Sequence, residues 1–250
     1  LRLQVAAASG RQIVELVRQG ITARQIMSRD AFHNAICLLL ATGGSTNAVM
    51  HLQAIHHEAG LGNLPLAEFD RLSRNIPLLA ALYPASEYDM IDFFEAGGIG
   101  AVEKALAPML QDQALTVTGQ TKAALWQENP TTSRPEVIHS LQDPVSADAG
   151  LAVLQGNLAP LGCVVKPAAV PEHMLHFFGS AQVFDSEEQA VEAILAGNVA
   201  PGSVLVLRYE GPKGGPGMPE MFRPMKVLEG MGLAQACAVI TDGRFSGSNR

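Results

Sequence analysis

The densest chemical signal in the chain is a rigid loop that ends in a carboxylate. Residues 210–221 read Glu-Gly-Pro-Lys-Gly-Gly-Pro-Gly-Met-Pro-Glu-Met and follow a strand predicted at 204–209. Glycines let a backbone approach a ligand closely, and prolines fix the shape of a loop. Glu220 would therefore be a carboxylate on a stiff loop, the kind of oxygen ligand that Mg²⁺ requires. An ordinary surface loop is the alternative, and the rigid composition disfavours it.

A hydroxyl group follows the next predicted strand. Residues 240–248 read Ile-Thr-Asp-Gly-Arg-Phe-Ser-Gly-Ser, so that Ser246 stands where a strand at 236–241 gives way to a loop, with Arg244 close by. The Gly-x-Ser-x-Gly elbow of hydrolases needs glycine at the position of Arg244, which disfavours a hydrolase triad. A serine here could act as a base if a cation or metal stabilised its alkoxide. Taken alone, the segment favours a structural turn.

A third stretch could bind an anion. Residues 42–47 read Thr-Gly-Gly-Ser-Thr-Asn, directly before a helix predicted at 47–59. Backbone N–H groups at the start of a helix can bind carboxylate or phosphate without a basic side chain. The Gly-Lys-Ser/Thr ending of a P-loop is absent, and taken alone the stretch favours simple capping of the helix. The candidate loop residues are Gly43, Gly44, Ser45, Thr46 and Asn47.

The composition limits the classes of function. The 250 residues include 17 Lys and Arg against 24 Asp and Glu, a net charge of −7, so no basic surplus exists to neutralise nucleic-acid phosphates or an anionic membrane. No apolar run approaches the ~20 residues that span a bilayer. Cys37, Cys163 and Cys237 are odd in number and widely spaced, which disfavours a disulfide scaffold and favours a reducing, cytoplasmic setting.

The patterning predicts an α/β protein in two parts. A mainly helical part precedes a polar, Pro/Thr-rich stretch at 126–135, and a strand-rich part with one clear helix follows it. Because position 1 falls before a helical pattern and Arg250 lies in a Gly/Ser loop, we expect an internal piece of a longer protein. The predicted helices are 12–19, 29–40, 47–59, 66–75, 90–96, 101–110 and 187–195, and the predicted strands are 150–154, 162–166, 181–184, 204–209 and 236–241.

The motifs occur in an order that resembles the dihydroxy-acid and sugar-acid dehydratase family. They are Gly-Gly-Ser-Thr-Asn-Ala at 43–48 followed by His51, then 211–220, and then Thr-Asp-Gly-Arg-Phe-Ser-Gly at 241–247. A softer match at 151–160 extends the resemblance, which runs from about residue 10 to the end of the chain. The second and third motifs are long and specific.

The resemblance implies a hydro-lyase that converts a 2,3-dihydroxy carboxylic acid to a 2-keto acid. In that family an iron–sulfur cluster acts on the C3 hydroxyl as a Lewis acid, and Mg²⁺ binds the carboxylate and the C2 hydroxyl. Ser246 matches the serine that removes the C2 proton, and Glu220 matches a magnesium ligand. Arg244 and Ser248 fall in the same loop and would contact substrate or lower the serine pKa. Dihydroxy-acid dehydration in branched-chain amino-acid biosynthesis is the first expectation.

The sequence also departs from the family pattern. The family's three cluster cysteines, which hold a 2Fe–2S or 4Fe–4S cluster, and its other magnesium ligands match positions before residue 1. Cys37, Cys163 and Cys237 match none of them. We therefore expect no cluster ligand within this chain and no activity from residues 1–250 alone. The resemblance further implies a homodimer whose partner is a small dihydroxy acid.

The resemblance also specifies the architecture and leaves alternatives. Residues 1–130 match the C-terminal portion of an α/β domain, and 131–250 match a truncated, β-barrel-like domain with flanking helices. A dehydratase of aldonic (sugar) acids is the first alternative. The resemblance disfavours a phosphogluconate dehydratase, because the sequence at 214–218 is more similar to the dihydroxy-acid branch of the family. A non-catalytic module that binds a carboxylate is the second alternative. The substitution Ser246→Ala would distinguish the two, because a binding module would keep its affinity whereas an enzyme would lose its reaction rate.

Overall fold

A computed structural model describes residues 2–83, 85–215 and 217–245 of the chain. The chain divides into two compact units. The first comprises 1–44, 48–82 and 88–163, and the second comprises 45–47, 83–87 and 164–250. The short segments 45–47 and 83–87 thus belong to the second unit although the chain around them belongs to the first. In the described part of the chain no helix is both long and apolar enough to cross a lipid bilayer.

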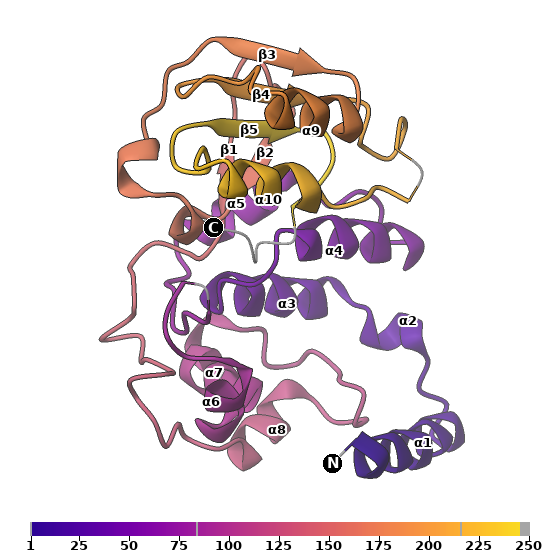
Figure 1. Ribbon diagram of the computed structural model, residues 1–250. Helices are drawn as coiled ribbons and strands as arrows, with labels where there is room; N and C mark the ends of the chain where they lie inside the picture. Colours follow the sequence, from indigo (N-terminus) through magenta and orange to yellow (C-terminus); the bar gives the residue numbers. More distant parts are fainter. Residues whose placement is uncertain (1, 84, 216, 246–250) are drawn as a thin grey trace. The chain divides into compact units, whose positions relative to one another are not determined.

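The first unit is mainly helical (Figure 1). Side-chain caps fix two helix starts: Ser28 Oγ accepts a hydrogen bond from Ala31 N at 3.2 Å, and Asp89 accepts from Ile91 N at 2.7 Å. The elements are α1 (Arg2–Arg18), α2 (Ala23–Ile26), α3 (Arg29–Ala41), α4 (Asn47–Glu58, whose first residue belongs to the second unit), α5 (Leu66–Ser73), α6 (Met90–Glu95), α7 (Gly98–Leu106), the 3₁₀ turn η1 (Ala107–Met109) and α8 (Lys122–Glu128). The strand β1 (Ala152–Leu154) pairs with β2 (Cys163–Val165, whose last two residues belong to the second unit) in a two-stranded sheet.

Helix α3 is the centre of the first unit's core. It packs against α5 and α7, and α5 in turn contacts β1. Ile36 and Leu40 of α3 and Leu106 of α7 are almost completely buried, each contributing roughly 1.5–3 kcal/mol through removal of apolar surface from water. An ion pair between Lys122 and the buried Glu103 joins α8 to α7.

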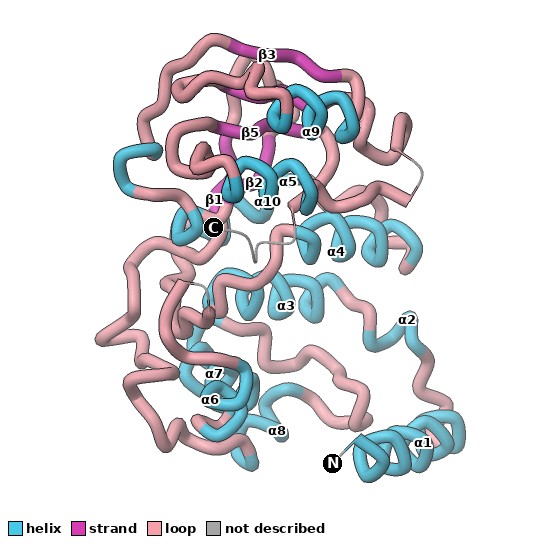
Figure 2. The backbone as a smooth tube through the Cα atoms, in the orientation of Figure 1, coloured by secondary structure: helices cyan, strands magenta, loops and turns pink. Residues whose placement is uncertain are grey.

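The second unit contains a three-stranded parallel sheet in the order β3-β4-β5 (Figure 1), and its strands are magenta in Figure 2. Its described elements are the 3₁₀ turns η2 (Pro167–Ala169) and η3 (Glu172–Met174), β3 (Ala181–Phe184), α9 (Glu187–Leu195), β4 (Val204–Leu207), α10 (Phe222–Gly230) and β5 (Ala238–Thr241). Leu207 pairs with Phe184 and Thr241, and α9 contacts both α10 and β4. Leu205, Leu207, Ile194 and Leu228 are fully buried and form the core of this unit.

The opposite face of this sheet is apolar and only partly covered. Val183 is 53% exposed and Ile240 is 38% exposed, and both pair in register with Val206. Neighbouring residues in register point to the same face of a sheet. One face of the sheet is therefore packed under helices, whereas the other presents a row of aliphatic side chains.

Mixed helix and sheet confirm the predicted α/β class, and most predicted elements are present. The predicted helix at 12–19 begins much earlier, at Arg2, and the one at 101–110 begins at Gly98. Helices α2, α8 and α10 were not predicted. The strand predicted at 204–209 ends at Leu207, because Tyr209 has a φ of +67° that no strand accommodates. The described strands form two small sheets and do not show the predicted barrel.

The close approach of two glycine backbones in the first unit gives a stability prediction. A Cβ added at Gly150 would lie 2.2 Å from Gly43 Cα, so the backbone must shift to admit alanine. We expect Gly150→Ala to lower the free energy of unfolding by about 1–3 kcal/mol, as overpacking does. The measurement is urea denaturation of the polypeptide that the gene encodes.

Gly10 supplies the matched control for this substitution. It lies inside α1, and a Cβ there meets no atom within 4 Å. Gly10→Ala should therefore raise stability by roughly 0.5–1 kcal/mol, because alanine loses less entropy in a helix. An unchanged urea midpoint for Gly150→Ala would contradict the close approach.

Candidate functional site

The candidate site is built on one edge of the parallel sheet in the second unit. Because β3, β4 and β5 run in the same direction, the segments that follow them leave from the same edge, where α/β proteins commonly bind ligands. Glu210, after β4, donates its N–H to Asp242 Oδ1, after β5, at 3.0 Å. Glu210 Oε1 accepts from the backbone N–H of Glu187, after β3, at 2.6 Å. Side chains therefore join all three exits.

The glycine-rich loop is pressed closely against this edge. A Cβ at Gly211 would lie 2.7 Å from the carbonyl oxygen of Asp242, and a Cβ at Gly215 would lie 2.7 Å from that of Glu210. Tyr209, directly before the loop, has a φ of +67°, and Met218, within the loop, has a φ of +49°, and such values cost energy for residues with side chains. The loop conformation is thus specific and strained, as the rigid composition predicted.

Arg244 fastens the far end of the loop. Its Nε donates to the carbonyl oxygen of Met218 at 2.6 Å, and its own carbonyl accepts from Met221 N at 2.9 Å. Glu220 forms a parallel bridge with Arg244, and the side chain of Met221 is fully buried. Glu220 is thereby held beside the segment that leads to Ser246. A substrate-contacting role for Arg244 stays a prediction.

The side chains of Thr46 and Asn47 complete the described site. Asn47 Nδ2 donates to Glu220 Oε1 at 2.5 Å, and Thr46 Oγ1 donates to the carbonyl oxygen of Phe245 at 2.8 Å. All four residues belong to the second unit. The structure thus brings Thr46, Asn47, Glu220 and Arg244 together. Ser246 and Ser248 lie outside the described residues.

The rest of the predicted anion loop has a different arrangement. The N–H groups of Gly43 and Gly44 donate to Leu40 and Leu39 carbonyls, at 3.4 and 3.1 Å, and so end α3. Asn47 N donates to Ser45 Oγ at 3.2 Å. These N–H groups already have acceptors. The carboxylate-binding role of the loop stays a prediction.

The oxygens around Glu220 fit a hard divalent cation. Glu220 is half-buried, and Asn47 Oδ1 is buried with no hydrogen-bond partner in the part of the chain that the structure describes. The carboxylate oxygens of Glu220 are ligands that Mg²⁺ accepts, and Asn47 Oδ1 is an acceptor beside them. Within residues 2–83, 85–215 and 217–245, no group of three His, Cys, Asp or Glu side chains could hold a metal. Glu220 would therefore supply one ligand of a larger shell.

The cysteines do not fit an iron–sulfur cluster. Cys37 is buried in α3, and burial raises the pKa of its thiol to about 12. Cys237 is also buried and lies 3.5 Å from the carbonyl oxygen of Ala200, whereas Cys163 is exposed. A cluster needs thiolates gathered around its irons. The three cysteines of this chain supply no such group.

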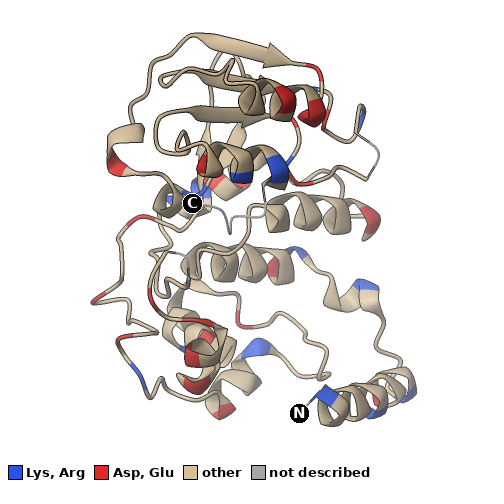
Figure 3. Ribbon diagram, in the orientation of Figure 1, with Lys and Arg blue, Asp and Glu red and all other residues tan. Residues whose placement is uncertain are grey.

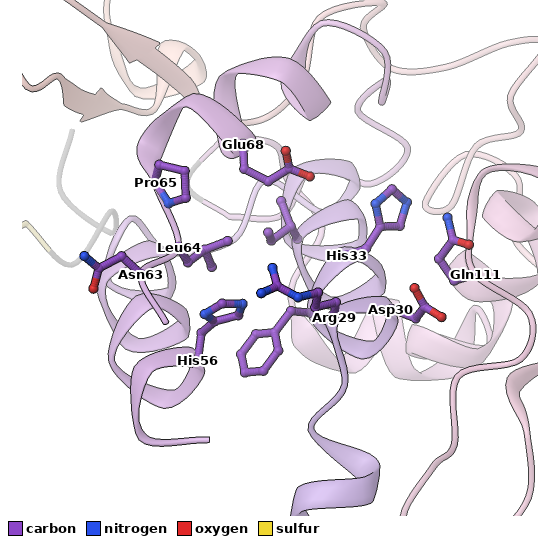
Figure 4. Close-up of a pocket in the computed structure, with 11 residues that line it drawn as sticks. Arg29, Asp30, His33, His56, Asn63, Leu64, Pro65, Glu68 and Gln111 are labelled. Carbon is purple, nitrogen blue, oxygen red and sulfur yellow. The ribbon is translucent and has the colours of Figure 1, made fainter. Parts of the chain in front are cut away.

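The first unit contains a separate cavity of about 340 Å³ beside α3 (Figure 4). Its polar groups are largely engaged: His56 Nδ1 pairs with the carbonyl oxygen of Gly62 at 2.8 Å, and Arg29 donates to that of Leu61 at 3.1 Å. The ring of His56 also packs edge-on against Phe32. These contacts are those of packing side chains.

Two adjacent glutamates at the start of α9, Glu187 and Glu188, have carboxyl pKa values shifted in opposite directions. Elsewhere, acidic and basic residues are interspersed among the elements (Figure 3). Burial raises the pKa of Glu187, which is 9% exposed, although its carboxylate accepts a hydrogen bond from Arg223 N. Hydrogen bonds from its own N–H and from Ser186 lower the pKa of the exposed Glu188. Since Arg223 lies at the start of α10, Glu187 also secures the helix that follows Glu220.

Sequence models of one family match almost the whole chain. The model described as dihydroxy-acid/6-phosphogluconate dehydratase N-terminal matches residues 1–125, and the model described as the C-terminal domain of the same family matches 136–250. The chain belongs to this dehydratase family.

Relatives named dihydroxy-acid dehydratase match the chain over its full length. The protein of Methanococcoides burtonii is 50% identical, and those of Caldanaerobacter subterraneus subsp. tengcongensis and Geobacter metallireducens are each 49% identical. Each match covers 100% of this chain and 45% of the relative. The chain therefore spans a little under half the length of these family members.

The buried carboxylate of Glu187 gives a pH-dependent prediction. A carboxyl whose pKa is raised on folding stabilises the fold below its ordinary pKa, and that contribution is lost as the pH rises through the raised value. Glu187→Gln keeps an oxygen for Arg223 N–H but does not ionise. We expect this variant to gain thermal stability over wild type as the pH rises from 5 to 8, measured by calorimetry.

Glu188→Gln is the matched control, with the opposite sign. A lowered carboxyl pKa stabilises the fold above the ordinary pKa, so this neighbour should lose a small amount of stability at pH 7, limited by solvent screening. Equal melting temperatures of Glu187→Gln and wild type at pH 8 would contradict burial of a charged carboxylate.

Proposed function

We propose that this chain supplies the proton-abstracting part of a dehydratase active site, which converts a 2,3-dihydroxy carboxylic acid to a 2-keto acid and water. The observation that carries the proposal is the placement of Glu220. Its carboxylate is fixed by Asn47 and its backbone by Arg244, two residues before Ser246. Family membership and relatives named dihydroxy-acid dehydratase support it.

The proposed roles follow from the chemistry of each side chain. Glu220 holds Mg²⁺, which when bound would stabilise negative charge on substrate oxygens as a C–H proton leaves. Ser246 Oγ takes the C2 proton, and this role rests on the family motif. Arg244 holds the glycine-rich loop through Met218, and contact of Arg244 and Ser248 with substrate is part of the proposal.

The proposal derives no step through an iron–sulfur cluster. The cysteines of this chain do not fit one, and we propose that the 2Fe–2S or 4Fe–4S cluster implied by the family is held by residues outside 1–250. Cys37 in particular is fully buried within α3, where burial disfavours the thiolate that a cluster iron needs.

For the substrate we propose a dihydroxy acid of branched-chain amino-acid biosynthesis, supported by the names of the relatives. Its carboxylate is proposed to bind near the 43–47 loop, where Thr46 and Asn47 reach the described site. A dehydratase of aldonic acids is the second candidate. Comparison of kcat/KM for 2,3-dihydroxy-isovalerate with that for an aldonic acid distinguishes them.

The larger architecture is also proposed from the family. Residues 1–130 would be the C-terminal portion of the α/β domain and 131–250 part of a barrel-like domain, supported by the two matched ranges. The exposed apolar face of the sheet that carries Val183 and Ile240 supports this proposal, because a barrel-like domain would cover such a face. We propose a cytoplasmic homodimer as the assembly. The molar mass of the encoded polypeptide in solution, measured by light scattering, tests the dimer.

Substitution of the proposed base and metal ligand tests the function. In the enzyme that the gene encodes, Ser246→Ala should lower kcat by at least about a thousandfold, as loss of a general base does at its upper range. Glu220→Gln should weaken Mg²⁺ binding and lower the rate. The measurement is formation of 2-keto acid. Full turnover by Ser246→Ala would exclude the proposed base, and ligand binding without turnover by the wild type would favour a carboxylate-binding module.

Residues 1–250 expressed alone provide a second test. They contain the base and one proposed metal ligand but no fitting cluster cysteines, so we expect no cluster absorbance and no 2-keto acid after reconstitution with iron and sulfide. The encoded polypeptide, treated identically, is the positive control. Normal turnover by residues 1–250 would overturn this division of roles.

A further inference from the structure

Thr46 and Asn47 are adjacent residues whose side chains reach two different parts of the site. We propose that Asn47 is a positioning residue for the carboxylate of Glu220, that its Oδ1 accepts a hydrogen bond from a hydroxyl of the bound dihydroxy acid, and that Thr46 positions the carbonyl group of Phe245, the last described residue before Ser246 in the sequence. The inference deepens the proposed function and rests on it.

The hydrogen bond between Asn47 and Glu220 has a definite polarity. At 2.5 Å the amide atom facing Glu220 Oε1 must be the donor Nδ2, because an amide oxygen and a carboxylate oxygen would repel each other. A neutral donor orders one carboxylate oxygen and leaves lone pairs of both oxygens for a cation. Partners of this kind orient metal ligands, and their loss typically weakens metal binding 10–100-fold.

The same orientation determines what Asn47 Oδ1 can do. This oxygen is buried and accepts no hydrogen bond from any described residue. Such an acceptor carries a desolvation penalty, which a bound donor would remove. A hydroxyl of a dihydroxy acid is a donor of the right chemistry at a site beside the proposed metal ligand. Asn47 would thus contact both the metal-binding carboxylate and the substrate.

Thr46 acts on the other part of the site. Its hydroxyl donates to the carbonyl oxygen of Phe245 at 2.8 Å, and Phe245 directly precedes Ser246. This bond fixes the carbonyl group of the residue that precedes the proposed base in the sequence. It does not touch Glu220, so its loss should affect proton removal and leave the metal site unchanged.

Simple helix capping does not explain these two side chains. Both are at the start of α4, where Ser, Thr and Asn usually accept hydrogen bonds from the first N–H groups of the helix. Here the side-chain donors bond to residues 173 and 199 positions away in the sequence. The amide and the hydroxyl are directed at the site, and Ser45 Oγ is the group that accepts from a local N–H, that of Asn47.

The test measures Mn²⁺ affinity and steady-state kinetics separately, in the enzyme that the gene encodes. Electron paramagnetic resonance of Mn²⁺ titrated into metal-depleted enzyme should show 10–100-fold weaker binding for Asn47→Ala and for the near-isosteric Asn47→Leu. Both variants should also raise KM, because the acceptor for the substrate hydroxyl is lost. Thr46→Val should bind Mn²⁺ within twofold of wild type yet lower kcat about tenfold or more, and Thr46→Ser should restore kcat.

The outcomes separate this inference from the proposed function. Glu220→Gln is the reference, and it should weaken Mn²⁺ binding whatever the role of Asn47. Wild-type Mn²⁺ affinity in Asn47→Leu, with weakened binding in Glu220→Gln, would overturn the inference and leave the proposed function standing. Unchanged affinity in Glu220→Gln would overturn the metal site itself. Equal weakening in Thr46→Val and Asn47→Ala would show general loosening, contrary to the separate roles.

Discussion

The parallel pairing of β4 with β5 is the constraint on which the candidate site depends. It brings the residues after Leu207 and those after Thr241 to one edge of the sheet. The glycine- and proline-rich loop at 210–221 and the segment at 242–245 therefore meet there. Glu210 and Asp242 join these exits directly, and the bridge between Glu220 and Arg244 closes the loop back onto the second segment. The loop is therefore anchored at both ends, and the carboxylate of Glu220 is at its second anchor.

Backbone strain in this region is balanced by specific hydrogen bonds. Met218 has a positive φ, and its carbonyl accepts from Arg244 Nε, a charged donor that forms a stronger bond than a neutral one. Buried Met221 and the bond from Arg223 N to Glu187 then set the start of α10. The guanidinium group of Arg244 thus donates its hydrogen bond to a carbonyl oxygen of the loop. This leaves Glu220 with a neutral partner.

Elements with strong local signals could be predicted from sequence, and those set by tertiary contacts could not. Helices α3 and α9 have the serine caps and apolar spacing that mark a helix start, and Ser186 does accept from Gln189 N. Helix α10 was missed because Pro224 and a Gly/Pro-rich loop conceal its beginning, although proline is tolerated in a first turn. Glu220 and Arg244 could be singled out by motif, but the bond from Asn47 spans 173 residues and leaves no local pattern.

The choice of an amide beside Glu220 has a physical reason. A lysine or arginine at the position of Asn47 would pair with the carboxylate and repel an incoming cation, because like charges at short range destabilise each other. An aliphatic residue would leave the carboxylate free to rotate among rotamers. Asparagine avoids both costs, since Nδ2 orders Glu220 without neutralising it and Oδ1 stays available as an acceptor. The proposed role of Asn47 thus uses a helix-start position for contacts that a cap alone would not require.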